Sequence, residues 1–448
     1  MKKLFGTDGI RGVAGVSPLD VPTIYSIGLA LAHSLARKES SPRVLLGMDT
    51  RESSEWIGAT LTAGLTTGGA LVESAGVITT PAIAFLSSKH GFAAGVVISA
   101  SHNPWQDNGI KVFGPDGYKL PDAAEFAIEE EIFRQLANLK TPAQYLTPPP
   151  VNESDRTEYL QFLLAAVRGL SLDGRRIVID CANGAASAVA PQLFAGLGGD
   201  VIITHASPNG RNINERCGAL HPEIVAAQVK VDRASMGITF DGDADRALFA
   251  DENGRVVNGD AVLLLAGRDL QARGLLTNST VVATTMSNMG LEAALKRSGI
   301  QMLRAAVGDK YVLEQMIATG AALGGEQSGH IIFSGRSTTG DGLLTALLLL
   351  DIVHRSGKPL AELVADLKVF PQVIVNVKVR EKMPLDGIPA VAAAIRAAEA
   401  ELRDTGRVVI RYSGTEALAR VMIEAESEPL MRHHADTIAA AIRTELGI

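Results

Sequence analysis

The sequence predicts an α/β protein in which three related α/β domains with mixed sheets surround a central cleft, followed by a smaller C-terminal α+β domain. Between residues 43 and 325, short apolar and β-branched runs alternate with longer stretches of helical spacing. This alternation recurs as three similar units, and after Phe370 it changes to a different order of segments. The repeat predicts related domains, and the change predicts a final domain of another fold.

Each of the three units contains three apolar runs that we expect to be strands. They are residues 43–48, 70–73 and 94–98 in the first unit, 176–179, 200–203 and 236–240 in the second, and 280–284, 301–307 and 321–323 in the third. The last run of each unit leads into a polar loop. Because ligands of α/β sheets bind beyond the carboxyl ends of the strands, we expect the three loops to face one cleft.

Changes in pattern and composition divide the chain. The expected domains are residues 1–152, 153–255, 256–369 and 370–448. Pro148-Pro-Pro150 makes residues 141–152 the clearest linker, whereas no breaker marks the boundary near residue 256. In the last domain the expected strands are residues 373–379, 408–412 and 418–425, and the expected helices are 388–404 and 429–446.

The composition excludes several classes of protein. A chain of 448 residues with 46% apolar and 20% charged residues is typical of a soluble protein with several domains. The formal net charge of −7 argues against nucleic-acid binding. Cys181 and Cys217 are too few for a disulfide framework and indicate free thiols in a reducing cytosol.

We also expect neither a membrane span nor a signal peptide. The longest apolar run, residues 343–353, is interrupted by Asp351 and is too short to span a bilayer. Met1-Lys-Lys-Leu-Phe5 leads directly into Gly-Thr-Asp-Gly, without the apolar region of a signal peptide. We therefore expect a cytoplasmic protein.

The loop Phe240-Asp-Gly-Asp-Ala-Asp-Arg246 predicts a cation site. Asp241, Asp243 and Asp245 alternate along what we expect to be extended chain, which would direct their carboxylates to one side. Three carboxylates suit a hard cation, and Mg²⁺ is the usual ion where phosphate is also bound. An EF-hand start also matches, with Glu252 at its twelfth place, but Arg246 replaces the glycine that an EF-hand requires.

Two further loops carry polar groups at strand ends. Gly95-Val-Val-Ile-Ser-Ala-Ser-His-Asn-Pro104 is a buried strand that runs into a loop bearing the hydroxyls of Ser99 and Ser101. Gly324-Gly-Glu-Gln-Ser-Gly-His330 offers a carboxylate and a hydroxyl, Glu326 and Ser328, that suit paired sugar hydroxyls. Taken alone, the first motif is better interpreted as an ordinary turn and the second as an ordinary glycine-rich loop.

A fourth group lies in the C-terminal domain, around Arg411-Tyr-Ser-Gly-Thr-Glu416. Hydroxyls and backbone N–H groups of a glycine-containing turn bind phosphate oxygens, and arginine adds a bidentate clamp. The candidate ligands are Arg411, Ser413, Gly414, Thr415 and Arg420. A basic turn on a solvated edge is the alternative interpretation.

Together these four motifs resemble those of the α-D-phosphohexomutase family, and the resemblance covers the whole chain. The N-terminal Phe5-Gly-Thr-Asp-Gly-Ile-Arg-Gly12 also matches the family. Tyr412 and Ala417 stand where the family commonly has prolines, which loosens the loop without removing a ligand. The resemblance implies three α/β domains and a C-terminal domain with a different fold.

The resemblance also implies a role for particular residues. Ser101 is the expected phosphoserine, and it would bind one Mg²⁺ together with Asp241, Asp243 and Asp245. The implied catalytic residues besides Ser101 are Lys111, His330, Arg246 and Arg11. Lys111 would be a general acid/base whose pKa is lowered by burial among cations. The implied substrate-binding residues are Thr7, Lys310, Glu326, Ser328, Arg411, Ser413, Gly414, Thr415 and Arg420.

The implied activity is that of an isomerase that moves phosphate between the 1- and 6-positions of a sugar through a 1,6-bisphosphate. The Gly-Glu-Gln-Ser-Gly-His form of the sugar loop is typical of family members that act on glucosamine phosphates, whose product feeds UDP-N-acetylglucosamine synthesis. Glucose or mannose phosphates are the alternative substrates, and a Mg²⁺-dependent sugar phosphatase or an inactive sugar-phosphate sensor is the alternative function. Glucosamine or glucose 1,6-bisphosphate is the candidate activator, and we expect a monomer or a homodimer.

Overall fold

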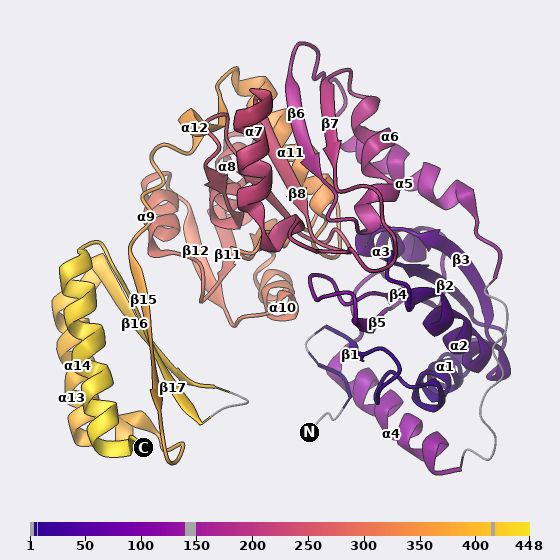
Figure 1. Cartoon of the computed structure of the whole chain (residues 1–448), viewed down its shortest axis with the longest axis horizontal. Helices are drawn as coiled ribbons and strands as arrows, with labels where there is room; N and C mark the ends of the chain where they lie inside the picture. The colour runs from indigo at the N-terminus through magenta and orange to yellow at the C-terminus, as the bar shows by residue number, and fades with distance from the viewer. Residues whose placement is uncertain (1–3, 7, 139–148, 414–416) are drawn as a thin grey trace. The chain divides into compact units, whose positions relative to one another are not determined.

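The computed structural model describes residues 4–6, 8–138, 149–413 and 417–448 (Figure 1). The chain divides into two compact units. The first comprises residues 1–286 and 299–365, and the second comprises residues 287–298 and 366–448. Among the described residues, no helix has both the length and the apolar character needed to cross a membrane.

Three mixed sheets form the first unit, and their strands follow one order. The first sheet is β1 (Ile10–Val13), β5 (Asp107–Phe113), β4 (Ala94–Ile98), β2 (Arg43–Met48) and β3 (Leu71–Val77). The second is β10 (Val256–Val257), β9 (Ala247–Ala250), β8 (Met236–Phe240), β6 (Arg176–Asp180) and β7 (Asp200–Thr204). The third, in the same direction, is β14 (Ile331–Phe333), β13 (Leu323–Gly325), β11 (Thr280–Thr284) and β12 (Gln301–Ala305).

The three sheets share one topology. In the first sheet β2 pairs in parallel with β3 and β4, and β4 pairs antiparallel with β5. In the second sheet β6 pairs in parallel with β7 and β8, and β8 pairs antiparallel with β9. In the third sheet β11 pairs in parallel with β12 and β13, and β13 pairs antiparallel with β14. The central strands β4, β8 and β11 are buried along their whole length, as their continuous apolar runs require. The prediction of three related α/β units with mixed sheets is confirmed.

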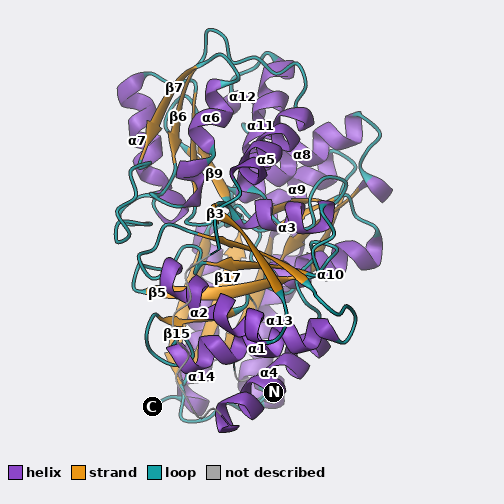
Figure 2. Cartoon of the chain, turned by 90° about the vertical axis from the view of Figure 1, so that its right-hand side faces the viewer, coloured by secondary structure: helices purple, strands orange, loops and turns teal. Residues whose placement is uncertain are grey.

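Helices connect and cover these strands (Figure 2). They are α1 (Val21–Ala36), α2 (Ser54–Thr67), α3 (Thr80–Lys89), α4 (Asp122–Asn138), α5 (Glu153–Ala166), α6 (Ala190–Ala195), α7 (Pro222–Asp232), α8 (Gly259–Ala272), α10 (Asp309–Thr319), α11 (Gly342–Ser356) and α12 (Leu360–Leu363). Short 3₁₀ turns are η1 (Ala185–Ala188), η2 (Gly218–Leu220) and η3 (Thr277–Ser279). Asp20, Asn258 and Asp341 cap α1, α8 and α11 by accepting hydrogen bonds from free N–H groups of the first turn.

One strand begins later than the sequence predicts. The expected strand 321–323 is β13 at Leu323–Gly325, so two glycines assigned to the loop belong to the sheet. A Cβ on Gly324 would lie 2.5 Å from Met316 Sδ, and one on Gly325 would lie 2.6 Å from the His330 carbonyl oxygen. Glycine is present here because α10 and the returning chain approach the strand closely, and strand propensity does not reveal this.

The second unit contains an antiparallel sheet in the order β15 (Gln372–Lys378), β17 (Leu418–Ala425) and β16 (Gly406–Tyr412). Its helices are α9 (Met289–Arg297), α13 (Pro389–Leu402) and α14 (Glu428–Leu446), with 3₁₀ turns η4 (Leu385–Gly387) and η5 (Arg403–Thr405). Apolar residues of α13 and α14 pack with those of the sheet in one core. The prediction of a smaller α+β unit at the C-terminus is confirmed.

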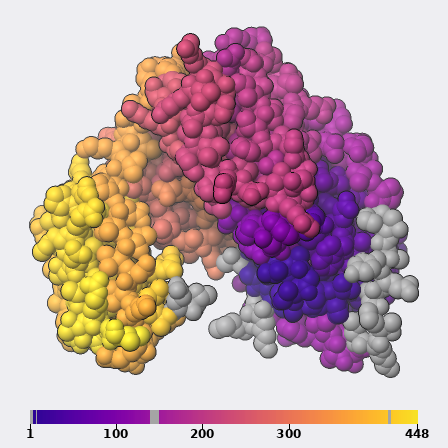
Figure 3. Space-filling view, in the orientation of Figure 1, coloured from indigo at the N-terminus to yellow at the C-terminus, as the bar shows by residue number. Residues whose placement is uncertain are grey.

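Within the first unit, the residues around the second sheet (176–257) lie against those around the first sheet (10–138) in the space-filling view (Figure 3). Hydrogen bonds join the loops of the two sheets: Thr80 N–H donates to the Asp243 carbonyl at 3.0 Å, and Glu52 N–H donates to the Gly210 carbonyl at 2.9 Å. These bonds bring the loops after β2 and β3 of the first sheet together with the loops after β7 and β8 of the second.

Candidate active site

The acidic loop that follows β8 gathers three carboxylates. Asp241, Asp243 and Asp245 are buried, and one ligand atom of each lies within 4.8 Å of the others, so that they could hold a metal ion. The expectation that they alternate along extended chain is wrong. Residues 242–245 turn and bend between β8 and β9, and Ala244, with a φ of 57°, donates its N–H to the Asp241 carbonyl. The turn, and not strand alternation, makes the carboxylates converge.

The chemistry of this cluster fits a divalent cation. Asp243 Oδ1 and Asp245 Oδ1 are buried without a hydrogen-bond partner in the described part of the chain. Burial raises the pKa of Asp241, and the like charges of Asp245 and Asp243 raise it further. Oxygen ligands with unsatisfied charge are the set that Mg²⁺ or Ca²⁺ binds.

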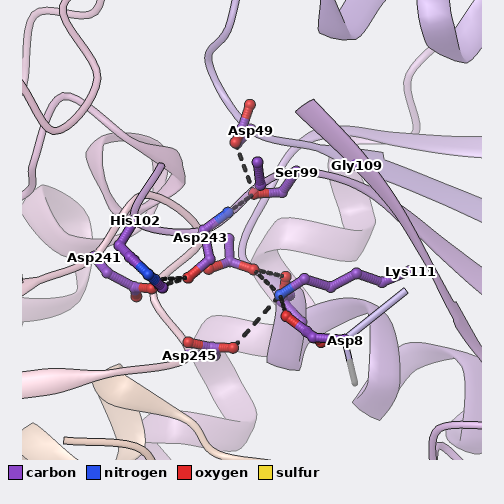
Figure 4. A network of polar contacts seen from close by, with 12 residues as sticks. Asp8, Asp49, Ser99, His102, Gly109, Lys111, Asp241, Asp243 and Asp245 are labelled. Atoms are coloured by element: carbon purple, nitrogen blue, oxygen red, sulfur yellow. Dashed lines mark hydrogen bonds and ion pairs between the residues drawn. The ribbon is translucent and has the colours of Figure 1, made fainter. Parts of the chain in front are cut away.

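The loop after β4, which carries Ser99 and His102, lies against this cluster (Figure 4), and its Ser101 contacts Asp241. Ser101 is 1% exposed and has a φ of 52°, in the left-handed region. Its Oγ donates to Asp241 Oδ2 at 2.5 Å and lies 3.2 Å from His102 Nδ1. A Cβ on Gly242 would lie 2.4 Å from the Ser101 carbonyl oxygen, so only glycine permits the two loops to meet this closely.

The second hydroxyl of the motif points elsewhere. Ser99 Oγ donates to Asp49 Oδ2 at 2.7 Å and accepts the Ser101 N–H at 2.9 Å. Ser99 therefore supports the loop from the core side, whereas Ser101 faces the acidic cluster.

A buried ion pair, which the sequence motifs did not indicate, holds the Ser101 loop. Arg51 and Asp49 have side chains with 0% exposure, and Arg51 Nε lies 2.8 Å from Asp49 Oδ2. The two terminal nitrogens of Arg51 donate to four backbone carbonyls, those of Ser101, Asn103, Pro104 and Asp107. One guanidinium thus anchors most of the loop. The signal in the sequence was Asp49-Thr-Arg51 directly after a buried strand.

Lys111 on β5 reaches the cluster from the first sheet. Its Nζ lies 2.7 Å from Asp243 Oδ2, 2.9 Å from Asp8 Oδ2 and 3.5 Å from Asp245 Oδ2. Burial alone would lower the pKa of Lys111, but Asp243 and Asp8 outweigh it and raise that pKa above its ordinary value. The prediction of a lowered pKa is wrong because the neighbours of Lys111 are mainly carboxylates.

A second lysine, also missed from the sequence, bridges distant segments. Lys119 Nζ contacts both Asp8 in the N-terminal loop and Asp309 at the start of α10. Asp309 Oδ2 in turn lies 3.6 Å from His330 Nε2. Asp8 belongs to the N-terminal motif that was recognised, whereas no motif pointed to Lys119.

These groups surround a cavity of about 400 Å³. The polar side chains that line it are those of Asp8, Arg11, His102, Asp245, Arg246, Asp309, Glu326 and His330. They come from loops of all three sheets, which confirms the predicted central cleft. Burial, with the positive charges of Arg246 and Arg11, lowers the pKa of His102 to about 4, so its imidazole is neutral at neutral pH.

The glycine-rich loop after β13 forms one wall of the cavity. Glu326 Oε1 accepts the Gly308 N–H at 3.1 Å, and Glu326 Oε2 accepts the Ser328 hydroxyl at 3.2 Å. Residues 327–328 form a turn, so a turn and not extended chain brings the Glu326 and Ser328 side chains together. His330 is 2% exposed, and its Nε2 accepts the Gly340 N–H at 3.3 Å.

Lys310 does not reach this cavity. Its Nζ contacts Asp122 on α4 and lies 3.7 Å from Glu125 Oε2. The Lys310 side chain lines a neighbouring cavity of about 490 Å³, and Asp309 lines both cavities. In this structure, therefore, Asp309 and not Lys310 faces the groups around Ser101.

In the second unit, Arg411 on β16 lies directly opposite Arg420 on β17. Directly opposite residues of an antiparallel pair lie on one face, so the two guanidinium groups can converge on an anion. Ser413 follows β16, and its N–H donates to the Leu418 carbonyl at 2.8 Å. Thr7, Gly414 and Thr415 lie outside the described residues, as does most of the expected linker 141–152.

Comparison with protein families gives four matches along the chain. Domains I, II and III of the phosphoglucomutase/phosphomannomutase alpha/beta/alpha type match residues 2–138, 157–254 and 258–370. The C-terminal domain of the same family matches residues 374–441.

Curated relatives match over the whole chain. A phosphoglucosamine mutase of Koribacter versatilis is 60% identical, covering 100% of this chain and 98% of that protein. One of Solibacter usitatus is 54% identical over 100% of this chain and 99% of its own length.

Solved structures share the fold. A phosphoglucomutase/phosphomannomutase family protein of Burkholderia thailandensis has a TM-score of 0.79 at 24% identity, over 99% of both chains. An N-acetylphosphoglucosamine mutase of Aspergillus fumigatus, in complex with GlcNAc-6P and magnesium, has a TM-score of 0.65 at 20% identity over 99% of this chain and 96% of that one. The chain belongs to the phosphoglucomutase/phosphomannomutase family of α-D-phosphohexomutases.

Proposed function

We propose that this chain is an isomerase that interconverts glucosamine 6-phosphate and glucosamine 1-phosphate through a phosphoserine and a 1,6-bisphosphate, and so feeds UDP-N-acetylglucosamine synthesis. The observation that carries the proposal is the 60% and 54% identity, over the whole chain, to curated phosphoglucosamine mutases. A phosphomannomutase or phosphoglucomutase activity is the second candidate, because the family models carry those names.

The reaction uses Ser101 twice. In the first step the 1-hydroxyl of glucosamine 6-phosphate attacks the phosphorus of phospho-Ser101. A bond from phosphorus to the sugar oxygen forms as the bond to Ser101 Oγ breaks, the sugar hydroxyl gives up a proton, and Ser101 Oγ takes one up. After the bisphosphate has turned over, Ser101 Oγ attacks the 6-phosphate, and glucosamine 1-phosphate leaves.

Proton transfer in these steps is assigned to Lys111 and His330. Lys111 Nζ lies 2.7 Å from Asp243, and its raised pKa keeps it protonated and positively charged. Lys111 would give a proton to the leaving Ser101 oxygen only as negative charge develops on that oxygen, because a general acid works best with a pKa near the working pH. His330 lines the cavity on the side of Glu326, where a sugar hydroxyl would lie. Arg11 and Arg246, which also line the cavity, would bind the transferring phosphate.

Asp241, Asp243 and Asp245, with an oxygen on Ser101, would hold one Mg²⁺ ion. When bound, Mg²⁺ neutralises charge on the transferring phosphoryl group. Lys111 and Arg246 contribute further positive charge, since Lys111 lies 3.5 Å from Asp245 Oδ2 and Arg246 lies 3.8 Å from Asp245 Oδ1.

The sugar and its distal phosphate are assigned to two groups. Glu326 and Ser328 would bind sugar hydroxyls, and Lys310 could join them only by leaving Asp122. Thr7 would assist at the transferring phosphate, and Arg411, Ser413, Gly414, Thr415 and Arg420 would bind the distal one. Activation by glucosamine or glucose 1,6-bisphosphate, a monomeric or dimeric state, a cytoplasmic location and the domain limits 1–152, 153–255, 256–369 and 370–448 belong to the same proposal.

The substrate is tested by measuring kcat/KM side by side for the 1-phosphates of glucosamine, glucose and mannose. We expect the highest kcat/KM for glucosamine 1-phosphate, because its 2-amino group is cationic and the Glu326 carboxylate lines the cavity. A charge-assisted hydrogen bond between the two would be about twice as strong as a neutral one. A preference for mannose or glucose phosphate would establish the second candidate instead. Release of free phosphate as the main product would establish a phosphatase and overturn the mutase proposal.

The Arg51 anchor leads to a separate prediction. Arg51→Lys keeps a cation beside Asp49 but loses the planar fork that reaches four carbonyls. We expect kcat to fall by about 10²-fold with little change in KM, because a shift of about 1 Å in a reacting group costs that much. Steady-state kinetics with a thermal melt would measure both effects.

The matched control is Arg43→Lys, which changes a partly exposed arginine paired with Glu73 on the same sheet. That variant should keep its kcat. An unchanged kcat in a folded Arg51→Lys protein would show that the loop does not depend on this anchor.

A further inference from the structure

A second group of metal-ligating side chains lies away from the Ser101 cavity. Asp180 is the last residue of β6, His205 follows β7, and Cys217 directly precedes η2. One ligand atom of each lies within 4.8 Å of the others. The carboxyl ends of β6 and β7 therefore carry a carboxylate, an imidazole and a thiol, at the edge of an α/β sheet where ligands bind. We propose that these three residues form a binding site for a thiophilic divalent cation, Zn²⁺ in particular.

The donor set distinguishes this site from the acidic cluster. Asp241, Asp243 and Asp245 offer only oxygen, which suits Mg²⁺, whereas an oxygen, a nitrogen and a sulfur suit Zn²⁺. Asp180 Oδ1 and His205 Nδ1 are 3.1 Å apart. Two ligands bound at about 2.0 to 2.1 Å in a tetrahedral arrangement lie about 3.3 Å apart, so one ion fits between them with a small adjustment.

The surroundings also suit a bound ion. Asp180 Oδ1 accepts the Ala182 N–H and Asp180 Oδ2 accepts the Gly218 N–H, both at 2.9 Å, which fixes the carboxylate. Asn183 Nδ2 lies 4.0 Å from Cys217 Sγ, in position to donate to a thiolate. Asp180 and Cys217 are 0% exposed, but the His205 side chain is 33% exposed and provides a path for entry and a place for a water ligand.

An ion pair between Asp180 and His205 is the simpler explanation of the cluster. It accounts for two of the three side chains, and among the described residues it leaves the buried Cys217 thiol with the long contact to Asn183 as its polar contact. A shared cation accounts for all three. The two explanations differ in whether the thiol is required.

A cation here would hold a loop that supports the nucleophile. Residues 205–218 carry Asn214, whose Nδ2 donates to the Ser101 carbonyl at 2.9 Å and to the Asn103 carbonyl at 3.1 Å. Asn214 N–H donates to the Ala182 carbonyl at 2.9 Å, two residues after Asp180. The ion would connect β6, β7 and this loop, so its role is structural and it takes no part in phosphoryl transfer.

The test is a Zn²⁺ titration of the full chain against a chromophoric chelator, with Mg²⁺ in excess to occupy the acidic cluster. We expect one Zn²⁺ per chain, and Co²⁺ in its place should give a thiolate-to-metal charge-transfer band. Cys217→Ser and His205→Gln should each weaken Zn²⁺ binding by at least about 10-fold, because even the loss of a residue that only supports a metal ligand costs about that much. The result stands apart from the proposed function, because no readout depends on activity.

Two control variants complete the design. Cys181→Ser removes the other buried thiol, and Asp243→Asn alters the Mg²⁺ cluster; both should keep the Zn²⁺ stoichiometry and the Co²⁺ band. Circular dichroism would verify that each variant is folded. Absence of the Co²⁺ band in the unaltered protein, or an unchanged Zn²⁺ affinity in folded Cys217→Ser, would overturn the proposal. Loss of binding in Asp243→Asn would do the same.

Discussion

Ser101→Ala is expected to abolish mutase activity while leaving the fold intact. The hydroxyl donates to Asp241 at 2.5 Å, and its loss removes the atom that carries the phosphate. Loss of a nucleophile lowers kcat by as much as about 10⁶-fold in other enzymes, whereas a small loop side chain contributes little to stability. A coupled assay with glucosamine 1,6-bisphosphate present would measure the loss, and intact-mass spectrometry should find no phosphate on the variant.

Ser99→Ala is the matched control, because it removes a hydroxyl two residues away in the same loop. Its Oγ supports the Ser101 N–H and Asp49 but does not face the acidic cluster. We expect a smaller loss of kcat and retained phosphorylation at Ser101. If Ser99→Ala instead lost the phosphate and Ser101→Ala kept it, the nucleophile would be the other hydroxyl.

Asp243→Asn is expected to have the second largest effect. The change keeps the shape of the side chain but removes one of three converging charges, and it weakens the contact of Oδ2 with Lys111 at 2.7 Å. Replacement of a residue that only supports a metal ligand lowers metal affinity by up to about 100-fold. Because Asp243 is itself a proposed ligand, we expect Mg²⁺ affinity to fall by at least about 100-fold. Activity measured as a function of Mg²⁺ concentration, after EDTA treatment, gives that affinity.

Asp251→Asn is the control for this variant. Asp251 is also a buried carboxylate, 2% exposed, and it directly follows β9 of the second sheet, but it accepts the N–H groups of Asn253 and Arg255 in a turn. Its replacement should leave the Mg²⁺ dependence unchanged. Full activity of the unaltered enzyme in EDTA would remove the metal from the proposal.

The strands of the repeat were predictable because their signal is local. β2, β4, β8 and β11 have the bounds expected from their apolar runs. The common topology followed, since similar units of strand and helix fold alike. Less was visible for β5, where Asn108, Gly109 and Lys111 interrupt the apolar pattern. Contacts with distant parts of the chain explain these residue types. Asn108 donates to Ser54, Gly109 leaves room for the Arg11 side chain, and Lys111 donates to Asp243.

The electrostatic environment of Lys111 was not predictable. A motif names the residue, but the sign of its pKa shift depends on which charges lie near Nζ. Asp8 and Asp243 lie close to it and raise its pKa, which reverses the expectation of neighbouring cations. The conformation of the acidic loop was also not predictable. The aspartates stand at alternate positions, which suggested extended chain, but residues 242–245 form a turn and a bend.

By itself, the sequence determined the α/β repeat, the different C-terminal unit and the residue types of each loop, because periodicity and motifs are properties of neighbouring residues. The tertiary structure alone decided which side chains meet. Ser101 contacts Asp241 across 140 residues of sequence, and Lys119 contacts Asp309 across 190. Arg51 belongs to none of the recognised motifs and is a central anchor in the fold. Such contacts arise only when segments distant in the sequence pack together, because a buried charged group needs a partner and no local pattern records which one it meets.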